Sequence, residues 1–198
     1  MALFTEAQLR QRGLAEVRKH GAIRKADQLI VEAAAQFSAA RPYDIFLSHS
    51  IRDAELVLGA KGALEDLRFS VYVDWIDDPQ LDRSQVTART AEQLRQRMRA
   101  SRSLFFLTTT NASTSKWMPW ECGYFDGQKE KVAIMPAPTA SHDDSFVGQE
   151  YLGLYPYVLR ANDAKHVPTL WVHTAKNRYV RFDQWVSKPG KDLEWQEA

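Results

Sequence analysis

The chain has 198 residues, enough for one well-packed domain with an extension but too few for two full-sized domains. Its 26 basic residues balance 25 acidic ones, so the net charge of +1 gives no reason to expect a nucleic-acid partner. The single cysteine, Cys122, excludes an internal disulfide and a thiolate zinc cluster. Without a signal-peptide pattern or a run of apolar residues that could span a bilayer, we expect a cytoplasmic protein with no membrane partner.

Residues 1–41 form a first segment whose apolar positions, from Leu9 to Phe37, recur at helical spacing. Gly13 and Gly21 are expected to interrupt the helix. The polar residues of the segment form no convergent set. We therefore expect a helical extension that serves packing or dimerisation rather than catalysis.

From Tyr43 on, short apolar runs alternate with helical patterns. The expected strands cover residues 43–48, 69–73, 103–108, 131–135 and 157–159, and the expected helices cover residues 54–67, 90–100 and a stretch that follows the polar run 111–115. This alternation indicates an α/β fold with a parallel sheet covered on both faces. We assign residues 42–160 to this domain and residues 161–198 to a C-terminal addition, with a hairpin formed by 169–173 and 179–182.

Polar residues gather where the expected strands end, and in open α/β sheets the ligand crevice lies beyond these carboxyl ends. The residues after the first two strands are Ser48, His49, Ser50 and Asp74. Each has an ordinary structural explanation as well, because strand-end serines commonly cap the next helix and an aspartate can brace the following loop. The acidic stretch 74–82 does not have the spacing of a calcium loop, so we expect no bound metal.

Glu121 lies in an aromatic run that follows the third strand. Trp117 precedes it by four residues, which places ring and carboxylate on one face of a helix. Pro119 is comfortable only in the first turn, so Trp117 is expected at the entry of the helix. Packing explains Trp117 equally well, and it also explains Tyr72, whose neighbours in the second strand are valines. Cys122 points away from Glu121 on an ideal helix.

Three of these runs resemble, in order, motifs of the TIR (Toll/interleukin-1 receptor) domains, and in particular bacterial antiphage-defence proteins of the Thoeris type. They are Tyr43-Asp-Ile-Phe-Leu-Ser-His-Ser, Phe69-Ser-Val-Tyr-Val-Asp and Trp117-Met-Pro-Trp-Glu. The resemblance covers about residues 42–136. It implies a flavodoxin-like domain with a mostly parallel five-stranded sheet, in which residues 75 to about 89 take the place of the variable BB loop.

The resemblance also implies cleavage of NAD+, as substrate and not as bound cofactor, with Glu121 in the place of the catalytic glutamate. A carboxylate there would stabilise the positive charge that moves onto the ribose when nicotinamide leaves. Candidate substrate contacts are Trp117, Tyr72, Ser48, His49, Ser50 and Asp74. Attack by water would give ADP-ribose, and attack by the substrate's own adenine or ribose hydroxyl would give a cyclic isomer. An aromatic wall beside the acid favours the cyclic signal.

Two other functions agree with the same residues. A TIR adaptor without enzymatic activity would act by self-association, and an enzyme like the nucleoside deoxyribosyltransferases would also place a glutamate at a ribose. For the enzyme, the resemblance implies activity that depends on assembly, with the BB loop of one copy completing its neighbour's site. It also implies a separate effector that detects the nucleotide product.

Overall fold

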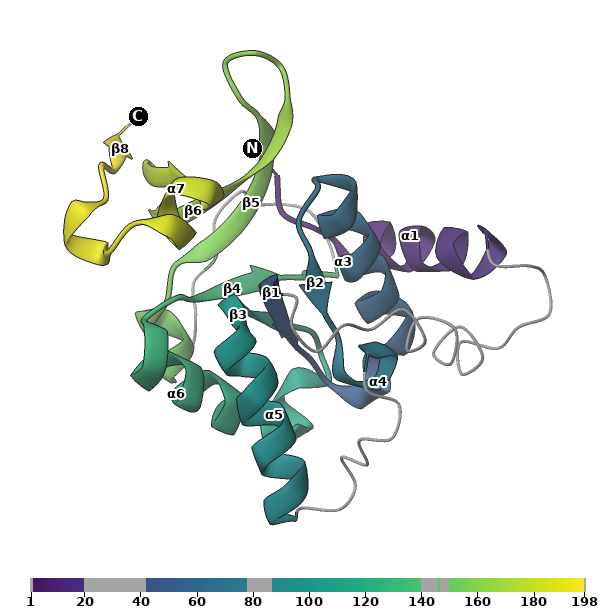
Figure 1. Cartoon of the computed structure of the whole chain (residues 1–198). Helices are drawn as coiled ribbons and strands as arrows, with labels where there is room; N and C mark the ends of the chain where they lie inside the picture. The colour runs from purple at the N-terminus through teal and green to yellow at the C-terminus, as the bar shows by residue number, and fades with distance from the viewer. Residues whose placement is uncertain (1, 20–41, 78–86, 140–145, 147–149, 198) are drawn as a thin grey trace.

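The computed structural model describes residues 2–19, 42–77, 87–139, 146 and 150–197 (Figure 1). Its centre is one eight-stranded sheet with the strand order β2-β1-β3-β4-β5-β6-β7-β8. The strands are β1 Tyr43–Ser48, β2 Val71–Tyr72, β3 Ser101–Thr108, β4 Val132–Pro136, β5 Tyr157–Asn162, β6 Pro168–Ala175, β7 Arg178–Arg181 and β8 Gln196–Glu197. β1 to β5 pair in parallel and β5 to β8 pair antiparallel, which confirms the expected α/β class and its five parallel strands.

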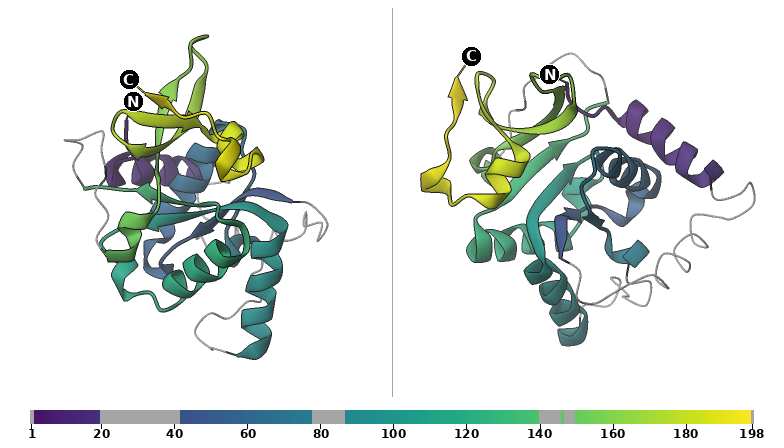
Figure 2. Two further views of the ribbon diagram at one scale, coloured as in Figure 1. Left: turned by 90° about the vertical axis from the view of Figure 1, so that its left-hand side faces the viewer. Right: turned by 45° about the horizontal axis from the view of Figure 1, so that its top comes forward.

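Helices cover both faces of the sheet (Figure 2). The α-helices are α1 Glu6–Lys19, α3 Ala54–Asp66, α4 Asp74–Asp77, α5 Ala88–Ala100, α6 Trp117–Lys129 and α7 Phe182–Ser187. Short 3-10 turns are η1 Ile51–Asp53, η2 Ala112–Thr114, η3 Glu150–Leu154 and η4 Gly190–Asp192. The hydrophobic core is divided by the sheet into two clusters, one beneath α1, α3 and α7 and the other beneath α5 and α6.

Alternation along β1 decides which side chains meet which helices. Ile45 and Leu47 belong to the cluster under α1 and α3, whereas Phe46 belongs to the cluster under α5 and α6. Because successive strand residues point to opposite faces, Ser48 lies on the same face as Phe46. The sheet therefore presents the hydroxyl of Ser48 to the side of α6.

The N-terminal segment packs on the domain through α1 and α3. Gly13 lies inside α1 and does not interrupt it, so that expectation was wrong. A Cβ added at Gly13 would lie 2.3 Å from the backbone oxygen of Glu55, and one added at Gly59 would lie 1.8 Å from that of Leu9. Both glycines are thus required by the close approach of two helix backbones. The second half of the expected N-terminal helix, including Gly21, lies outside the described residues.

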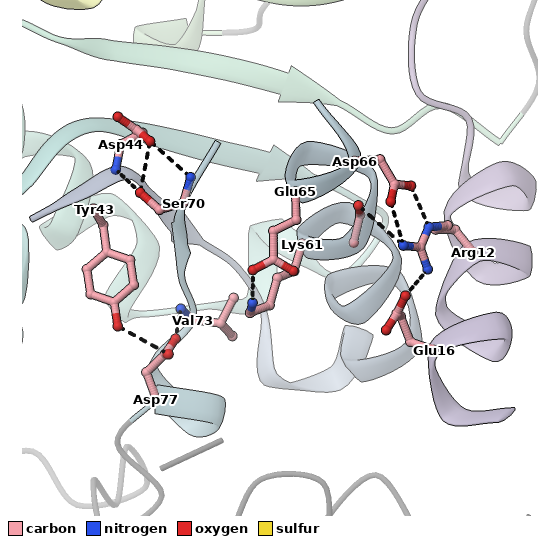
Figure 3. A network of polar contacts seen from close by, with 11 residues as sticks. Arg12, Glu16, Tyr43, Asp44, Lys61, Glu65, Asp66, Ser70, Val73 and Asp77 are labelled. Carbon is pink, nitrogen blue, oxygen red and sulfur yellow. Dashed lines mark hydrogen bonds and ion pairs between the residues drawn. The ribbon is translucent and has the colours of Figure 1, made fainter. Parts of the chain in front are cut away.

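Polar contacts at the rim hold the same two helices together. Arg12 of α1 donates from Nε and Nη2 to the two carboxylate oxygens of Asp66 of α3, at 2.8 and 2.9 Å, and also pairs with Glu16 (Figure 3). Such a two-pronged arginine contact adds geometric specificity to the packing. Nearer the chain start, Ala2 and Arg160 of β5 exchange two backbone hydrogen bonds of 2.9 and 3.0 Å. The structure therefore shows that α1 packs against α3.

The C-terminal residues lengthen the same sheet. The expected hairpin is present as β6 and β7, while β8 and α7 were not anticipated. Phe182 and Trp185 of α7 are buried in the cluster that also holds Phe105 of β3. The domain boundaries placed at residues 41 and 160 stay predictions. Among the helices that the structure describes, none is long and apolar enough to cross a membrane.

Candidate functional site

Glu121 is buried against the end of β1. Its carboxylate oxygen Oε2 accepts a hydrogen bond of 2.6 Å from the hydroxyl of Ser48. Both residues have an exposed fraction of 0%. A short hydrogen bond to a carboxylate is among the stronger ones, and burial increases its electrostatic strength. Ser48 therefore binds Glu121, and it does not serve the helix-capping role that the sequence also allowed.

His49 and Asp74 form a second buried pair beside the first. Nε2 of His49 lies 3.3 Å from Oδ1 of Asp74, and its Nδ1 lies 2.8 Å from the carbonyl oxygen of Leu47. The pair is almost fully removed from solvent, with exposed fractions of 1% for His49 and 2% for Asp74.

Asp74 is the first residue of α4, and side-chain hydrogen bonds hold the last residue of this short helix, Asp77. Asp77 accepts hydrogen bonds from the backbone nitrogen of Val73, at 2.7 Å, and from the hydroxyl of Tyr43, at 3.3 Å (Figure 3). Residues 78–86, which make up most of the stretch expected as the BB loop, lie outside the described residues. The structure thus anchors the chain at the point where that stretch starts.

Ser50 and Asp53 follow β1 in the turn that leads into α3. The side chain of Ser50 accepts from the backbone nitrogen of Arg52 at 3.4 Å, which is the capping role expected for it. Asp53 stands at the N-cap position of α3 but makes no side-chain cap bond there. It accepts instead from the side chains of Thr109 and Asn111, which follow β3.

Trp117 is the first residue of α6, so the expectation that it stands at the helix entry is confirmed. Its half-buried ring packs edge-on against Trp120, with 5.4 Å between ring centroids. Trp120 in turn stacks on Tyr124, and the guanidinium of Arg95 lies over both rings. An aromatic row therefore runs along α6 next to the turn that holds Glu121.

Tyr72 is fully buried, and of its two interpretations the structure shows packing. Its ring stacks on Phe46 with 5.1 Å between centroids, and it meets the ring of Tyr43 edge-on at 5.5 Å. The alternation in β2 explains this position, because Val71 and Val73 belong to the cluster on the opposite face of the sheet. The substrate contact predicted for Tyr72 stays a prediction.

Cys122 follows Glu121 in α6 and belongs to the core cluster beneath α5 and α6. Its thiol is buried, and burial raises its pKa from 9.0 to about 11. Because a thiol reacts as the thiolate, only about one molecule in a thousand is reactive at pH 8. We expect iodoacetamide at pH 8 to leave Cys122 unmodified in the folded protein and to modify it in guanidinium chloride, measured by the mass of the intact chain. Rapid alkylation of the folded protein would contradict this environment.

Within the described ranges, no group of three or more acidic, histidine or cysteine side chains is arranged to hold a metal ion. Most of the acidic stretch 74–82 and the run His142-Asp-Asp lie outside these ranges. The chemistry available at the site is therefore that of a buried carboxylate, a hydroxyl that orients it, an adjacent imidazole–carboxylate pair and an aromatic row. This set suits the stabilisation of a developing positive charge at a buried position.

Sequence reasoning selected Glu121, Ser48, His49 and Asp74, which the structure brings together at the carboxyl ends of β1 and β2, and their functional roles stay predictions. It missed the role of Asp53 and its partners. The polar run 111–115 after β3 was a visible signal, and within it Ser115 accepts a hydrogen bond from the backbone nitrogen of Met118, at 3.3 Å.

Comparison with known proteins gives two relatives, and the chain matches no family model. It is 47% identical over 192 residues to the probable 3' cyclic ADP-D-ribose synthase ThsB' of Bacillus cereus (strain MSX-D12), an alignment that covers 95% of this chain and 100% of the relative. It is 34% identical over 83 residues to the putative cyclic ADP-D-ribose synthase TIR2 of Cytobacillus dafuensis, which covers 41% of this chain and 22% of that protein.

Proposed function

Because the chain belongs to the Thoeris-type TIR proteins, we propose that it converts NAD+ into nicotinamide and a cyclic ADP-ribose that acts as a signal in antiphage defence. The observation that supports this function best is the carboxylate of Glu121, buried at the carboxyl ends of the strands and held by the hydroxyl of Ser48 at 2.6 Å. Cleavage of the bond between ribose and a cationic ring is favoured by a buried carboxylate that is held in one position.

The reaction starts with rupture of the bond between ribose C1 and the pyridinium nitrogen. The bonding electron pair leaves with nicotinamide, which becomes neutral, and the positive charge moves to the ribose as an oxocarbenium-like species. Glu121 lies where its negative charge can offset that change, and Ser48 keeps the carboxylate in one orientation. Because nicotinamide departs as a neutral molecule, no general acid is required.

Burial of the site favours cyclisation over hydrolysis. Ser48, His49, Asp74 and Glu121 have exposed fractions of 0 to 2%. Exclusion of water removes the competing nucleophile, so that a nucleophile on the substrate itself can form the new bond to ribose C1. When that nucleophile is a hydroxyl, its proton is lost as the bond forms. The half-buried ring of Trp117 is suited to stack on a flat ring of the folded substrate.

The proposed function predicts the mass of the product. Incubation of NAD+ with concentrated protein in water enriched in ¹⁸O, followed by chromatography with mass detection, is expected to give nicotinamide and a nucleotide that weighs one water less than ADP-ribose and carries no label. Linear ADP-ribose labelled with ¹⁸O would show hydrolysis instead. Intact NAD+ beside cleaved free deoxynucleosides would contradict the proposal and favour a deoxyribosyltransferase-like enzyme.

We further propose that activity requires self-association, with residues 75–89 of one copy completing the site of the next, and that the product acts on a separate effector. The burial of Glu121 agrees with a site that is rearranged before substrate enters. Nicotinamide release that rises more steeply than linearly with protein concentration is the expected result. A strictly linear dependence over a wide range would contradict a role for assembly.

A further inference from the structure

Asp53 is a buried carboxylate at the end of η1, only 4% exposed. Its Oδ1 accepts a hydrogen bond of 2.6 Å from Nδ2 of Asn111, and its Oδ2 accepts one from the hydroxyl of Thr109. The donors lie 58 and 56 residues further along the chain. A carboxylate removed from water is costly unless donors satisfy it, and here two side chains of one loop supply both bonds. We call this arrangement the Asp53 clamp.

On one side, the clamp is joined to the segment that carries Ser48. The backbone nitrogen of Asp53 donates to the carbonyl oxygen of Ser50 at 3.1 Å, closing the tight turn η1 directly after β1. The carboxylate is therefore fixed relative to the strand end. Four residues lie between Asp53 and Ser48, whose hydroxyl binds Glu121.

On the other side, the clamp is joined to the start of α6. Beyond Thr109 and Asn111, the hydroxyl of Thr114 donates to the carbonyl oxygen of Asn111 at 2.8 Å. Ser115 then accepts from the backbone nitrogen of Met118, at 3.3 Å, in the first turn of α6. Met118 is fully buried, so this turn is also fixed by packing. The loop between β3 and α6 is thus a short, internally bonded connection from Asp53 to the helix of Glu121.

We propose that Asp53 is a positioning residue for the conversion of NAD+: its clamp and the Ser48–Glu121 bond are two attachments that together set where α6 lies relative to the end of β1. This inference rests on the proposed function. Core packing through Met118 holds α6 on the sheet without a preferred direction, and the two hydrogen-bonded attachments add directional contacts at the start of the helix. A displacement of about 1 Å in a reacting group can lower the rate about a hundredfold, so loss of the clamp should appear in turnover.

Exchange of the two partners tests the clamp. In Asn111→Asp two carboxylates face each other, and we expect kcat for nicotinamide release to fall about 10- to 100-fold with KM changed less than about threefold, because charge stabilisation acts in the transition state. In the double variant Asp53→Asn with Asn111→Asp, the amide again donates to a carboxylate and its oxygen accepts from Thr109. We expect kcat to return to within about threefold of the wild-type value.

Two further variants keep the test decisive. Asn162→Asp makes the same chemical change at an exposed position of β5 and is expected to leave kcat unchanged. Thr109→Val removes one donor without adding charge, and it serves if Asn111→Asp fails to fold. Wild-type kcat in both Asn111→Asp and Thr109→Val, or a double variant no faster than Asn111→Asp alone, would overturn the proposal.

Hydrogen exchange of residues 109–118, followed by mass spectrometry, tests this inference independently of the proposed function. We expect faster exchange in Asn111→Asp and normal exchange in the double variant. If these exchange rates are found but the protein leaves NAD+ intact, the result would support the Asp53 clamp and contradict the proposed function. If Asn111→Asp changes neither the exchange rates nor kcat of an active enzyme, the result would contradict the inference about the clamp and leave the proposed function in place.

Discussion

Glu121→Gln is expected to lower kcat for nicotinamide release about 10²- to 10³-fold, the usual effect of removing one preorganised electrostatic group. Glutamine keeps the size of the side chain, and its amide oxygen can still accept from the hydroxyl of Ser48. The substitution therefore removes the charge while it preserves the hydrogen bond of 2.6 Å that holds the side chain. Steady-state kinetics of nicotinamide release measure the effect.

The control for this substitution is Glu65→Gln. Glu65 lies at the exposed end of α3, where it pairs with Lys61 at the surface, so its change is expected to leave both kcat and the melting temperature unchanged. The melting temperature of Glu121→Gln should not fall, because a neutral amide is easier to bury than a carboxylate. Full activity of Glu121→Gln would contradict the role assigned to Glu121. If Glu121→Gln does not fold, the same measurement is made on Glu121→Asp.

Gly59→Ala is expected to produce the largest loss of stability among single methyl additions in α1 and α3. The added Cβ would lie 1.8 Å from the backbone oxygen of Leu9, and a backbone atom cannot rotate away as a side chain can. Overpacking of this kind costs about 3 kcal/mol, and the better helix propensity of alanine offsets about 1 kcal/mol. The net loss of about 2 kcal/mol corresponds to a fall in melting temperature of about 4–8 °C, measurable by circular dichroism.

Gly127→Ala is the matched control. This glycine lies within α6, and a Cβ added there has no atom within 4 Å. The same change is therefore expected to raise the melting temperature slightly, through helix propensity alone. Equal effects at the two positions would show that α1 and α3 do not approach as closely as the structure indicates.

Local patterns explain why much of the fold was predictable. The apolar run that became β1 and the helical spacing that became α3 each depend on neighbours in sequence, and both were located correctly. The catalytic role predicted for Glu121 rests on the resemblance of residues 117–121 to the catalytic helix of TIR domains. The face occupied by Ser48 follows from the period of two along a strand.

Contacts between segments far apart in sequence explain what was missed. Gly13 looks like a helix breaker until the backbone of α3 is placed against it, at a distance that only glycine permits. An aspartate at the start of a helix has an obvious local role as a cap, whereas the partners of Asp53 follow β3, more than fifty residues away. β8 has two residues and no apolar pattern, so its pairing with β7 depends on the sheet that is already formed.

A double-mutant cycle of Ser48→Ala and Glu121→Gln tests the central claim most directly, namely that the buried hydroxyl and carboxylate work on NAD+ as one unit. The single variant Ser48→Ala is expected to lower kcat about tenfold, because the carboxylate loses the donor that orients it. In the Glu121→Gln background the same change should cost less than about threefold, since the charge that Ser48 orients is already absent. Full multiplication of the two single effects, or nicotinamide release that neither substitution alters, would contradict the account.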